Sequence, residues 1–430
     1  MRHKRILMIM LLQSIVSHAT DTNTSANFSE SRLPLKELRT FTQVFEQIRL
    51  GYVEEITDIE LLENAITGLL SNLDPHSTYL NTKDYDDLQE NASGEYGGLG
   101  IEVIGENGVI KIIAPIDGTP AAQAGLEAGD LITELDNSPI RGMDLQNAID
   151  KLRGVKGTSI KLTIFRKGQK APLNFDITRN IIQISSVRSR ILKPNYGYVR
   201  IAQFQTSTGE DFVTEVDKLI IENGSPLNGL IIDLRNNPGG LVPASVSVAD
   251  SLINSGTLVY TEGRLQSSNR RFNATSGDIL SGVPIAVLIN GGSASASEIV
   301  AGALQDSKRA IIVGTQSFGK GSVQTVMPLD NGRAVKLTTA LYFTPSGKSI
   351  QAEGITPDII IEPAEITPYK KGSALREKNL DGHLGAEVKN DSDSDLLSDT
   401  ASYPTDDNQL YEALNLLRGF QLLSEHSQNH

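Results

Sequence analysis

Three serines alternate with alanine in the segment GGSASASE, residues 291–298, between an apolar run and a helical pattern. A turn of small residues at a helix N-terminus presents backbone N–H groups that stabilise a negative charge, as an oxyanion hole does. Ser293, Ser295 and Ser297 are all candidate nucleophiles, and the local pattern does not choose among them. A plain helix start is the alternative, because Ser295 followed by Glu298 forms a capping box.

A candidate base follows at Lys320, in the segment SFGKGSVQ, residues 317–324. A lysine between glycines and against an apolar sheet is desolvated, and burial lowers a lysine pKa so that the amine can act as a neutral base. On a strand, Lys320, Ser322 and Gln324 would share one face, and Gln324 could orient the lysine. The alternative is a solvated surface lysine. A P-loop is not expected, because Gly321 stands where Ser or Thr should bind magnesium.

A third candidate is the segment DLRNNPGG, residues 233–240, which ends an apolar strand in a glycine-rich turn. Crevices at the carboxyl ends of strands are the usual ligand sites of α/β proteins. The N–H groups of Gly239 and Gly240 could complete an oxyanion hole, although a simple tight turn explains the pattern equally well.

The positions of the histidines decide between mechanisms. The six histidines are residues 3, 18, 76, 383, 426 and 430, so none lies between residues 77 and 382. A Ser-His-Asp triad is therefore not expected there, although His76 or His383 could fold in, and a lysine base is the more natural choice. The chain has no cysteine, which excludes thiol nucleophiles and Cys-type zinc sites. Its net charge of −13 disfavours nucleic acid as a partner.

The candidate segments need a scaffold, and 430 residues are enough for two to four domains with buried cores. Residues 187–365 alternate apolar strands with helical patterns and predict an α/β domain. Strands at 322–329 and 334–343 are expected to complete its sheet. Residues 261–280 are polar and predict an exposed hairpin or loop.

Residues 94–186 predict a compact module of five or six short strands and two helices. Thr119 is expected to be the N-cap of the first of these helices, with Pro120 at its first position. Residues 34–93 form a mainly helical N-terminal region, which breaks at residues 74–76.

The two ends of the chain differ in character. Residues 1–19 have basic residues, an apolar run and a small-x-small site, which predict a signal peptide cleaved near Ala19. An exported chain without cysteine suits a bacterial periplasm. Residues 20–33 predict a flexible tail and residues 366–404 a polar linker. Residues 405–430 predict an amphipathic helix, and docking on its own domain or a dimer contact would cover its apolar face equally well.

Five segments, in order over residues 35–365, together resemble the carboxy-terminal processing peptidases, or tail-specific proteases. They are LDPHS at 73–77, GLGI at 98–101, DLRNNPGG at 233–240, SASASE at 293–298 and SFGKG at 317–321. The resemblance implies a multidomain α/β protein. Its parts would be a crotonase-like catalytic core, an inserted PDZ domain and helical N- and C-terminal regions. No metal and no organic cofactor is implied.

The resemblance also implies roles for individual residues. Ser295 would be the nucleophile, Lys320 the general base and Gln324 the partner of the lysine. The oxyanion hole would be formed by Ala296 N–H and by Gly239 or Gly240.

In the PDZ domain, Leu99, Gly100 and Ile101 would bind the carboxylate of a substrate C-terminus. Arg153 would couple that binding to activity, or would be a surface arginine at a helix end.

The expected function is an exported serine endopeptidase that recognises protein C-termini and cleaves periplasmic proteins. Its expected partners are protein substrates, further copies of the chain and, as a candidate, an adaptor protein. The rival interpretation is a noncatalytic binding protein, or a scaffold that is latent without a partner.

Overall fold

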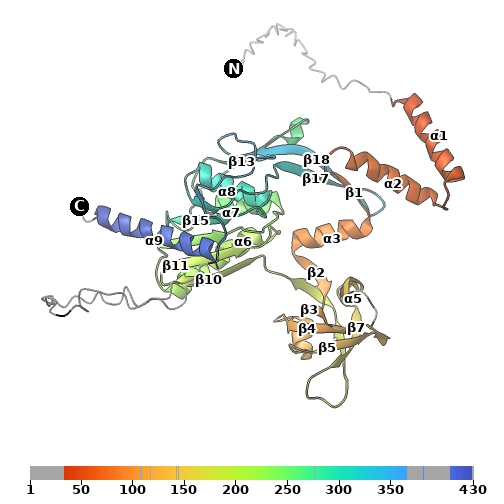
Figure 1. Cartoon of the computed structure of the whole chain (residues 1–430), viewed down its shortest axis with the longest axis horizontal. Helices are drawn as coiled ribbons and strands as arrows, with labels where there is room; N and C mark the ends of the chain where they lie inside the picture. The colour runs from red at the N-terminus through yellow and green to blue at the C-terminus, as the bar shows by residue number, and fades with distance from the viewer. Residues whose placement is uncertain are drawn as a thin grey trace, which may run out of the picture. The chain divides into compact units, whose positions relative to one another are not determined.

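The computed structural model describes residues 33–365, apart from 107–108, 117, 142, 144 and 276, and also residues 381 and 407–428 (Figure 1). The chain divides into two compact units, Met1–Leu69 and Leu70–His430. The predicted signal peptide, the tail up to residue 32 and nearly all of the polar linker lie outside the described residues, as does His383.

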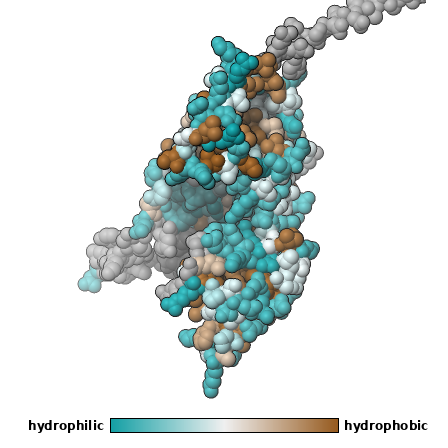
Figure 2. Space-filling view, turned by 90° about the vertical axis from the view of Figure 1, so that its right-hand side faces the viewer, coloured by the Kyte–Doolittle hydropathy of each residue, from teal (hydrophilic) through white to brown (hydrophobic). Residues whose placement is uncertain are grey.

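The first unit is helical, as the sequence predicts, with α1 (Leu35–Gly51) and most of α2 (Asp58–Ser71). No residue of α1 is buried, and of α2 only Leu61 is. Apolar residues are exposed on the surface of this unit (Figure 2). The exposed apolar side chains of its helices include Leu38, Phe41, Val44 and Leu62. These helices therefore enclose no core of their own within the described residues.

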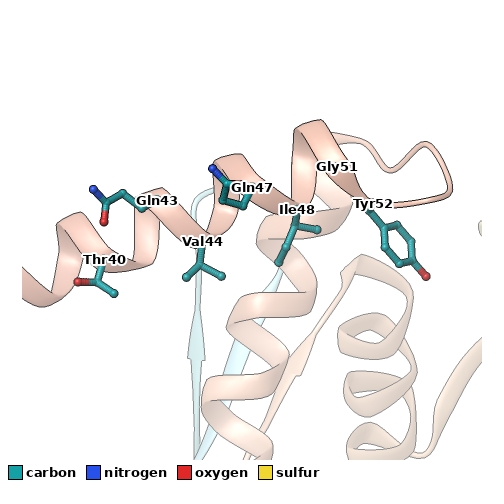
Figure 3. Close-up of a pocket in the computed structure, with 7 residues that line it drawn as sticks. All are labelled: Thr40, Gln43, Val44, Gln47, Ile48, Gly51 and Tyr52. Atoms are coloured by element: carbon teal, nitrogen blue, oxygen red, sulfur yellow. The ribbon is translucent and has the colours of Figure 1, made fainter.

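A groove of about 420 Å³ follows one side of α1. Figure 3 shows Val44 and Ile48 pointing to the same side of the helix, as residues four apart do. The groove is lined by Thr40, Gln43, Val44, Gln47, Ile48, Gly51 and Tyr52. Because this lining contains no carboxylate, lysine, arginine or histidine, we assign no chemistry to it.

A tight turn at Asp74 ends the helical region. The Asp74 carboxylate accepts hydrogen bonds from the backbone N–H groups of His76 (2.8 Å) and Ser77 (3.0 Å). The chain then forms β1 (Thr78–Leu80), a short strand that the sequence did not predict, and α3 (Thr82–Ser93). Asn81 caps α3 through a bond from Asp84 N–H. Gly94, in the left-handed conformation, ends the helix.

The module that follows is built on one sheet in the order β3-β4-β5-β7-β8, with β6 paired to β5. Its strands are β3 (Ile101–Glu106), β4 (Val109–Pro115), β5 (Leu131–Leu135), β6 (Ser138–Pro139), β7 (Ser159–Phe165) and β8 (Leu173–Thr178). The helices are α4 (Pro120–Ala124) and α5 (Leu145–Leu152), and β2 (Glu95–Gly98) pairs with β9 (Asn180–Gln183). Alternating residues such as Ile160, Leu162 and Ile164 are fully buried and form its core.

Thr119 stands at the N-cap of α4, but its side chain does not cap the helix. Its hydroxyl donates to the carbonyls of Ile116 (2.6 Å) and Gly100 (3.1 Å) instead. The predicted N-cap position of Thr119 and first helical position of Pro120 are thus confirmed, although these two carbonyls engage the hydroxyl and leave it no capping bond.

The largest core surrounds a second sheet in the order β10-β11-β12-β15-β16-β19, which is parallel from β11 onward. Its strands are β10 (Val187–Lys193), β11 (Tyr196–Ile201), β12 (Gly229–Asp233), β15 (Ile285–Ile289), β16 (Ile311–Gly314) and β19 (Ile359–Ile360). The helices α6 (Thr208–Asn223), α7 (Val242–Asp250) and α8 (Ala296–Asp306) pack with Leu230 and Ile232 on one face. Packing on this face explains why every second residue of β12 is apolar.

The C-terminal helix α9 (Asn408–Gln428) covers the opposite face. Its Leu410, Ala413, Leu414 and Leu417 pack with Ile231, Ala286, Leu288 and Val313. Of the two coverings that the sequence allows for this stripe, docking on its own domain is the one observed (Figure 1). None of the described helices is both long and apolar enough to cross a membrane.

Two predicted strands do not join that sheet. β17 (Ser322–Pro328) and β18 (Ala334–Phe343) form a separate sheet with β1, β13 (Thr257–Gly263) and β14 (Arg270–Asn273). The expectation that they complete the main sheet is wrong, because β18 pairs with β1, β13 and β17. The hairpin predicted within residues 261–280 is formed by β13 and β14, with a short 3-10 turn (Gln266–Ser268) between them.

Candidate active site

The three alternating serines have different surroundings. Ser293 Oγ donates to the carbonyl of Leu234 (2.8 Å), and Ser297 Oγ donates to the carbonyl of Asn237 (2.9 Å). Both side chains are fully buried and hold the DLRNNPGG turn against the start of α8. Ser295 instead lines a cavity. The structure therefore separates one serine from its neighbours, which local sequence pattern does not.

The backbone of Ser295 is unusual, with φ 55° and ψ −112°. A positive φ is rare for a residue with a Cβ, and such strain persists where the surrounding structure enforces it. Ser295 is the N-cap residue of α8, and the capping box with Glu298 is present. The helix start therefore does not exclude a chemical role for Ser295.

Glu298 ties the two halves of the site together. This fully buried carboxylate accepts hydrogen bonds from Ser295 N–H (2.7 Å) and Lys320 N–H (2.9 Å) through one oxygen. Its other oxygen accepts from Ser317 Oγ and Gly319 N–H, both at 2.6 Å. The sequence pointed to Glu298 only as a capping residue, because three of these donors lie about 20 residues further along the chain.

Lys320 is half-buried and lines the same cavity as Ser295. Burial lowers its pKa, and the nearby charge of Lys336 lowers it further, while Glu298 acts in the opposite direction. The predicted strand face shared by Lys320, Ser322 and Gln324 is wrong for Lys320, because Lys320 precedes β17. Ser322 and Gln324 are hydrogen-bonded to each other, although a bulge follows Val323. The bulge interrupts the alternation on which that prediction depended.

Gln324 nevertheless lines the cavity. Its Nε2 donates to the hydroxyls of Ser322 (2.9 Å) and Thr338 (3.3 Å). Among the described residues no hydrogen bond joins Gln324 to Lys320, so the expected pairing is not formed in this structure.

The cavity has a volume of about 570 Å³ and brings together segments far apart in the sequence. Its walls are largely apolar and include Leu88 and Ala92 of α3, and Leu241 and Val242 at the start of α7. An apolar wall excludes water and strengthens charge interactions inside the cavity. Within the described part of the chain, no cluster of His, Asp and Glu could hold a metal ion.

Tyr342 also lines the cavity and contacts the candidate nucleophile. Its hydroxyl lies 3.3 Å from Ser295 Oγ, and burial raises its pKa, so it stays protonated. Sequence reasoning missed Tyr342, because one tyrosine in an alternating strand carries no chemical signal.

The glycine turn offers backbone donors beside Ser295. Gly239 N–H donates to Asn237 Oδ1 (2.9 Å) and is therefore engaged. Gly240 lines the cavity, and no acceptor for its N–H or for that of Ala296 is found among the described residues. A Cβ at Gly239 would lie 2.8 Å from Ser295 Cβ, and its φ is 103°, so the close approach requires glycine.

The same turn is anchored to α9. Arg235 bonds to Asp233 through Nε (3.0 Å) and Nη2 (2.7 Å), and to both carboxylate oxygens of Asp407 at 2.8 and 2.7 Å. The Arg235 guanidinium helps to hold the pKa of Asp407 below its usual range despite burial, which opposes this. Docking of α9 is therefore linked to the strand end that leads into the glycine turn.

Charged residues of the site act on the pKa of His76. Burial lowers the pKa of His76, and the positive charges of Lys320 and Lys336 lower it further, while Asp74 raises it. Its backbone N–H is held by Asp74.

The expected carboxylate-binding loop of the module has its carbonyls engaged. Leu99 O accepts from Ala121 N–H (2.9 Å) and Gly100 O accepts from Ile116 N–H (2.9 Å). Ile101 begins β3, which lies at an edge of the sheet. The edge of β3 is therefore open to a further strand.

Arg153 follows α5 and bridges to α3. Its Nη1 donates to Glu90 (3.2 Å), and its guanidinium lies 4.9 Å from the centre of the Tyr96 ring. It is thus an arginine at a helix end that also contacts the segment preceding the module. Lys83 of α3 makes a second ion pair with Asp150 of α5 (2.8 Å).

Comparison with known families finds three matches. Residues 195–361 match peptidase family S41, residues 111–166 match the PDZ domain, and residues 7–84 match the activating protease CtpB N-terminal domain. The S41 match contains Ser295, Lys320 and Gln324, and the PDZ match contains Arg153.

Relatives named as carboxy-terminal processing proteases resemble most of the chain. The carboxy-terminal-processing protease of Bartonella bacilliformis is 48% identical over 388 residues, which cover 89% of this chain and 89% of that protein. The carboxy-terminal processing protease CtpA of Bacillus subtilis is 32% identical, covering 86% of this chain and 79% of that protein. The solved photosystem II D1 C-terminal processing protease is 31% identical, with a TM-score of 0.45 over 78% of this chain and 88% of that one. This chain is therefore a serine-type peptidase that belongs to the carboxy-terminal processing proteases of peptidase family S41.

Proposed function

We propose that Ser295 and Lys320 form the catalytic dyad of an endopeptidase. The observation that supports this proposal most directly is that the three serines have different surroundings. Ser295 shares a largely apolar cavity with Lys320, whereas Ser293 and Ser297 donate to backbone carbonyls. The lowered pKa of Lys320 supports the role of a neutral amine base.

In the proposed mechanism, neutral Lys320 accepts the Oγ proton as Ser295 attacks the carbonyl carbon of the scissile peptide bond. The carbonyl oxygen becomes an oxyanion that accepts hydrogen bonds from Ala296 N–H and Gly240 N–H. The C–N bond then breaks, and the Lys320 ammonium gives its proton to the leaving amine. Lys320 then takes a proton from water, which attacks the carbonyl carbon of the resulting ester. The bond from that carbon to Ser295 Oγ breaks, the acid product leaves, and the Lys320 ammonium returns its proton to Ser295 Oγ.

Gly240 is proposed for the oxyanion hole in place of Gly239, because Asn237 already accepts the Gly239 N–H. Gln324 is proposed to orient Lys320 once substrate is bound, through its amide oxygen. Catalytic hydrogen bonds often tighten only when substrate binds, so the unpaired arrangement is compatible with this role.

The PDZ domain is proposed to capture the C-terminus of a protein substrate. The N–H groups of Leu99, Gly100 and Ile101 would bind the carboxylate, and the peptide would add a strand to the open edge of β3. Arg153 is proposed to couple this capture to activity, which its contacts with Glu90 and Tyr96 support.

The wider assignments are also proposals. They are a crotonase-like core at 187–365, a PDZ domain at 94–186, a helical region at 34–93 and a C-terminal helix within 405–430. Export to the periplasm, with cleavage near Ala19, rests on the sequence of residues 1–19. Further copies of the chain and an adaptor protein are proposed partners besides protein substrates.

The test is cleavage of an unfolded protein by the wild type and by Ser295→Ala, each with and without candidate partners. Loss of cleavage in Ser295→Ala, with folding and peptide binding intact, is the expected result. Wild-type cleavage by Ser295→Ala would contradict the dyad. An inert wild type under all conditions would favour the noncatalytic interpretation.

A further inference from the structure

We propose that Asp74 sets the orientation of the Gln324 amide, through Thr338, so that the amide oxygen is the end left for Lys320. Asp74 is then a positioning residue for the proposed dyad, although it lies about 220 residues before Ser295 in the sequence. This inference rests on the proposed function, because it assigns a task to Gln324.

A continuous chain of hydrogen bonds joins Asp74 to Gln324. Thr338 Oγ1 donates to Asp74 Oδ1 (3.0 Å), and Gln324 Nε2 donates to Thr338 Oγ1 (3.3 Å). Further hydrogen bonds hold residues 74–77 against β18. Ser77 Oγ donates to Asp74 Oδ2 (2.6 Å) and accepts from Thr338 N–H (3.1 Å).

Strand pairing fixes the same junction. β1 begins four residues after Asp74 and is antiparallel to β18, with Thr78 opposite Lys336. β18 in turn pairs with β17, where Gln324 is opposite Thr338. The relay therefore connects two paired strands, β17 and β18, to the tight turn at Asp74 that leads into β1.

The direction of the bonds follows from the groups themselves. An ionised carboxylate only accepts hydrogen bonds, whereas a threonine hydroxyl has one proton to donate. Asp74 accepts the hydrogen bond that the Thr338 hydroxyl donates. Thr338 Oγ1 can then only accept from Gln324, so it selects the NH₂ group of the amide. Hydrogen bonds from Ser77, His76 and Thr338 keep the pKa of Asp74 low despite partial burial, so it remains ionised at neutral pH.

The bonds to Nε2 decide which atom of the Gln324 amide is left for Lys320. With both of its partners, Thr338 and Ser322, bonded to Nε2, the amide oxygen remains to accept an N–H of Lys320. In the reversed orientation, Gln324 would offer an N–H to the lone pair of Lys320. That lone pair must accept the proton of Ser295, so the reversed amide would compete with catalysis.

The experiment uses the full chain and measures kcat and KM on an unfolded protein substrate. Thr338→Val removes the relay hydroxyl at nearly constant volume, and Thr338→Ser restores it. Thr339→Val is the matched control, because the Thr339 hydroxyl bonds to Thr325 and not to the relay. Thermal unfolding of each variant separates loss of fold from loss of function.

We expect Thr338→Val and Asp74→Ala each to lower kcat by about tenfold with little change in KM, as the loss of one positioning hydrogen bond allows. Thr338→Ser and Thr339→Val should stay near the wild-type kcat. In a Thr338→Val background, Asp74→Ala should lower kcat no further, because the relay is already broken.

Wild-type kcat in Thr338→Val would overturn the inference, and so would an equal loss in Thr338→Ser or additive losses in the double variant. If Asp74→Ala does not fold, the three threonine variants decide alone. Ser295→Ala distinguishes failure of the proposed function from failure of the relay alone, because full activity of Ser295→Ala would refute the proposed function. An inactive Ser295→Ala beside a fully active Thr338→Val would refute only the relay. A fully active Gln324→Ala would refute both the relay and the proposed task of Gln324, and would leave the Ser295–Lys320 dyad standing.

Discussion

The backbone N–H of Ser295 donates a 2.7 Å hydrogen bond to the buried carboxylate of Glu298. The same oxygen accepts the backbone N–H of Lys320 at 2.9 Å. One side chain thus fixes the turn that carries the proposed nucleophile and the loop that carries the proposed base. The strained backbone of Ser295 is enforced in part by this contact.

Glu298→Gln should therefore impair catalysis and stability together. A glutamine has one acceptor oxygen, and its NH₂ group would face two of the four donors that now bond to the carboxylate. Leaving two buried donors unpaired costs about 2–6 kcal/mol, taking about 1–3 kcal/mol for each. Denaturant unfolding and kcat measure the two effects, and a variant with wild-type kcat and stability would contradict this role.

The three serines should respond differently to substitution by alanine. Ser295→Ala should lower kcat by at least about a thousandfold, which is the scale for removal of a nucleophile. Ser293→Ala and Ser297→Ala should keep measurable cleavage and lose stability instead, because each side chain holds a backbone carbonyl. Measuring kcat and the unfolding midpoint for all three tests this, and an inactive, stable Ser293→Ala would point to a different nucleophile.

Lys336 should tune the pH dependence of cleavage. Its positive charge lowers the pKa of Lys320, so Lys336→Met should raise that pKa. Because the base acts in its neutral form, activity rises with pH through the Lys320 pKa. The acid limb of the kcat/KM profile should then move to higher pH in Lys336→Met.

Lys336→Arg is the control for charge and should leave the limb near its wild-type position. Glu298 also acts on the pKa of Lys320, and Asp74 and both lysines act on that of His76. Glu298, Asp74 and His76 are unchanged in these variants. A limb that moves to lower pH in Lys336→Met would contradict Lys320 as the titrating base.

Recognition of substrate should depend on a free carboxylate at its C-terminus. A peptide acid should bind more tightly than the same peptide with an amidated end, because the N–H groups of Leu99 and Gly100 gain a charged acceptor. Fluorescence anisotropy with the two labelled peptides measures the difference. Equal affinities would show that the module does not read the carboxylate.

Much of the fold follows from local pattern in the sequence. The strand predicted at 334–343 is observed as β18 over the same residues, and the continuous apolar pattern at 230–234 matches β12, which is covered on both faces. The short strand β1 was missed, because three residues give no periodicity. Assigning β17 and β18 to the main sheet failed, because strand partners lie far along the chain and leave no local signal.

The site was predictable in its residue types and less so in its geometry. Ser295, Lys320 and Gln324 line one cavity, and the catalytic roles that the resemblance implies for them stay predictions. A bulge after Val323 interrupts the alternation of side chains that was expected along this strand. No single residue in the segment predicts this bulge. The preference for Gly240 depends on the side chain of Asn237, and only three-dimensional structure shows which N–H group that side chain engages.

The measurement that tests the central claim most directly is the cleavage rate of Lys320→Arg. Arginine keeps the positive charge of protonated lysine on a slightly longer side chain, but it does not deprotonate in proteins. The account predicts a stable, inactive variant, whose rate stays at background across the pH range in which wild-type activity rises. Wild-type-like cleavage by Lys320→Arg would contradict the Ser295–Lys320 dyad and would make His76 the next candidate base.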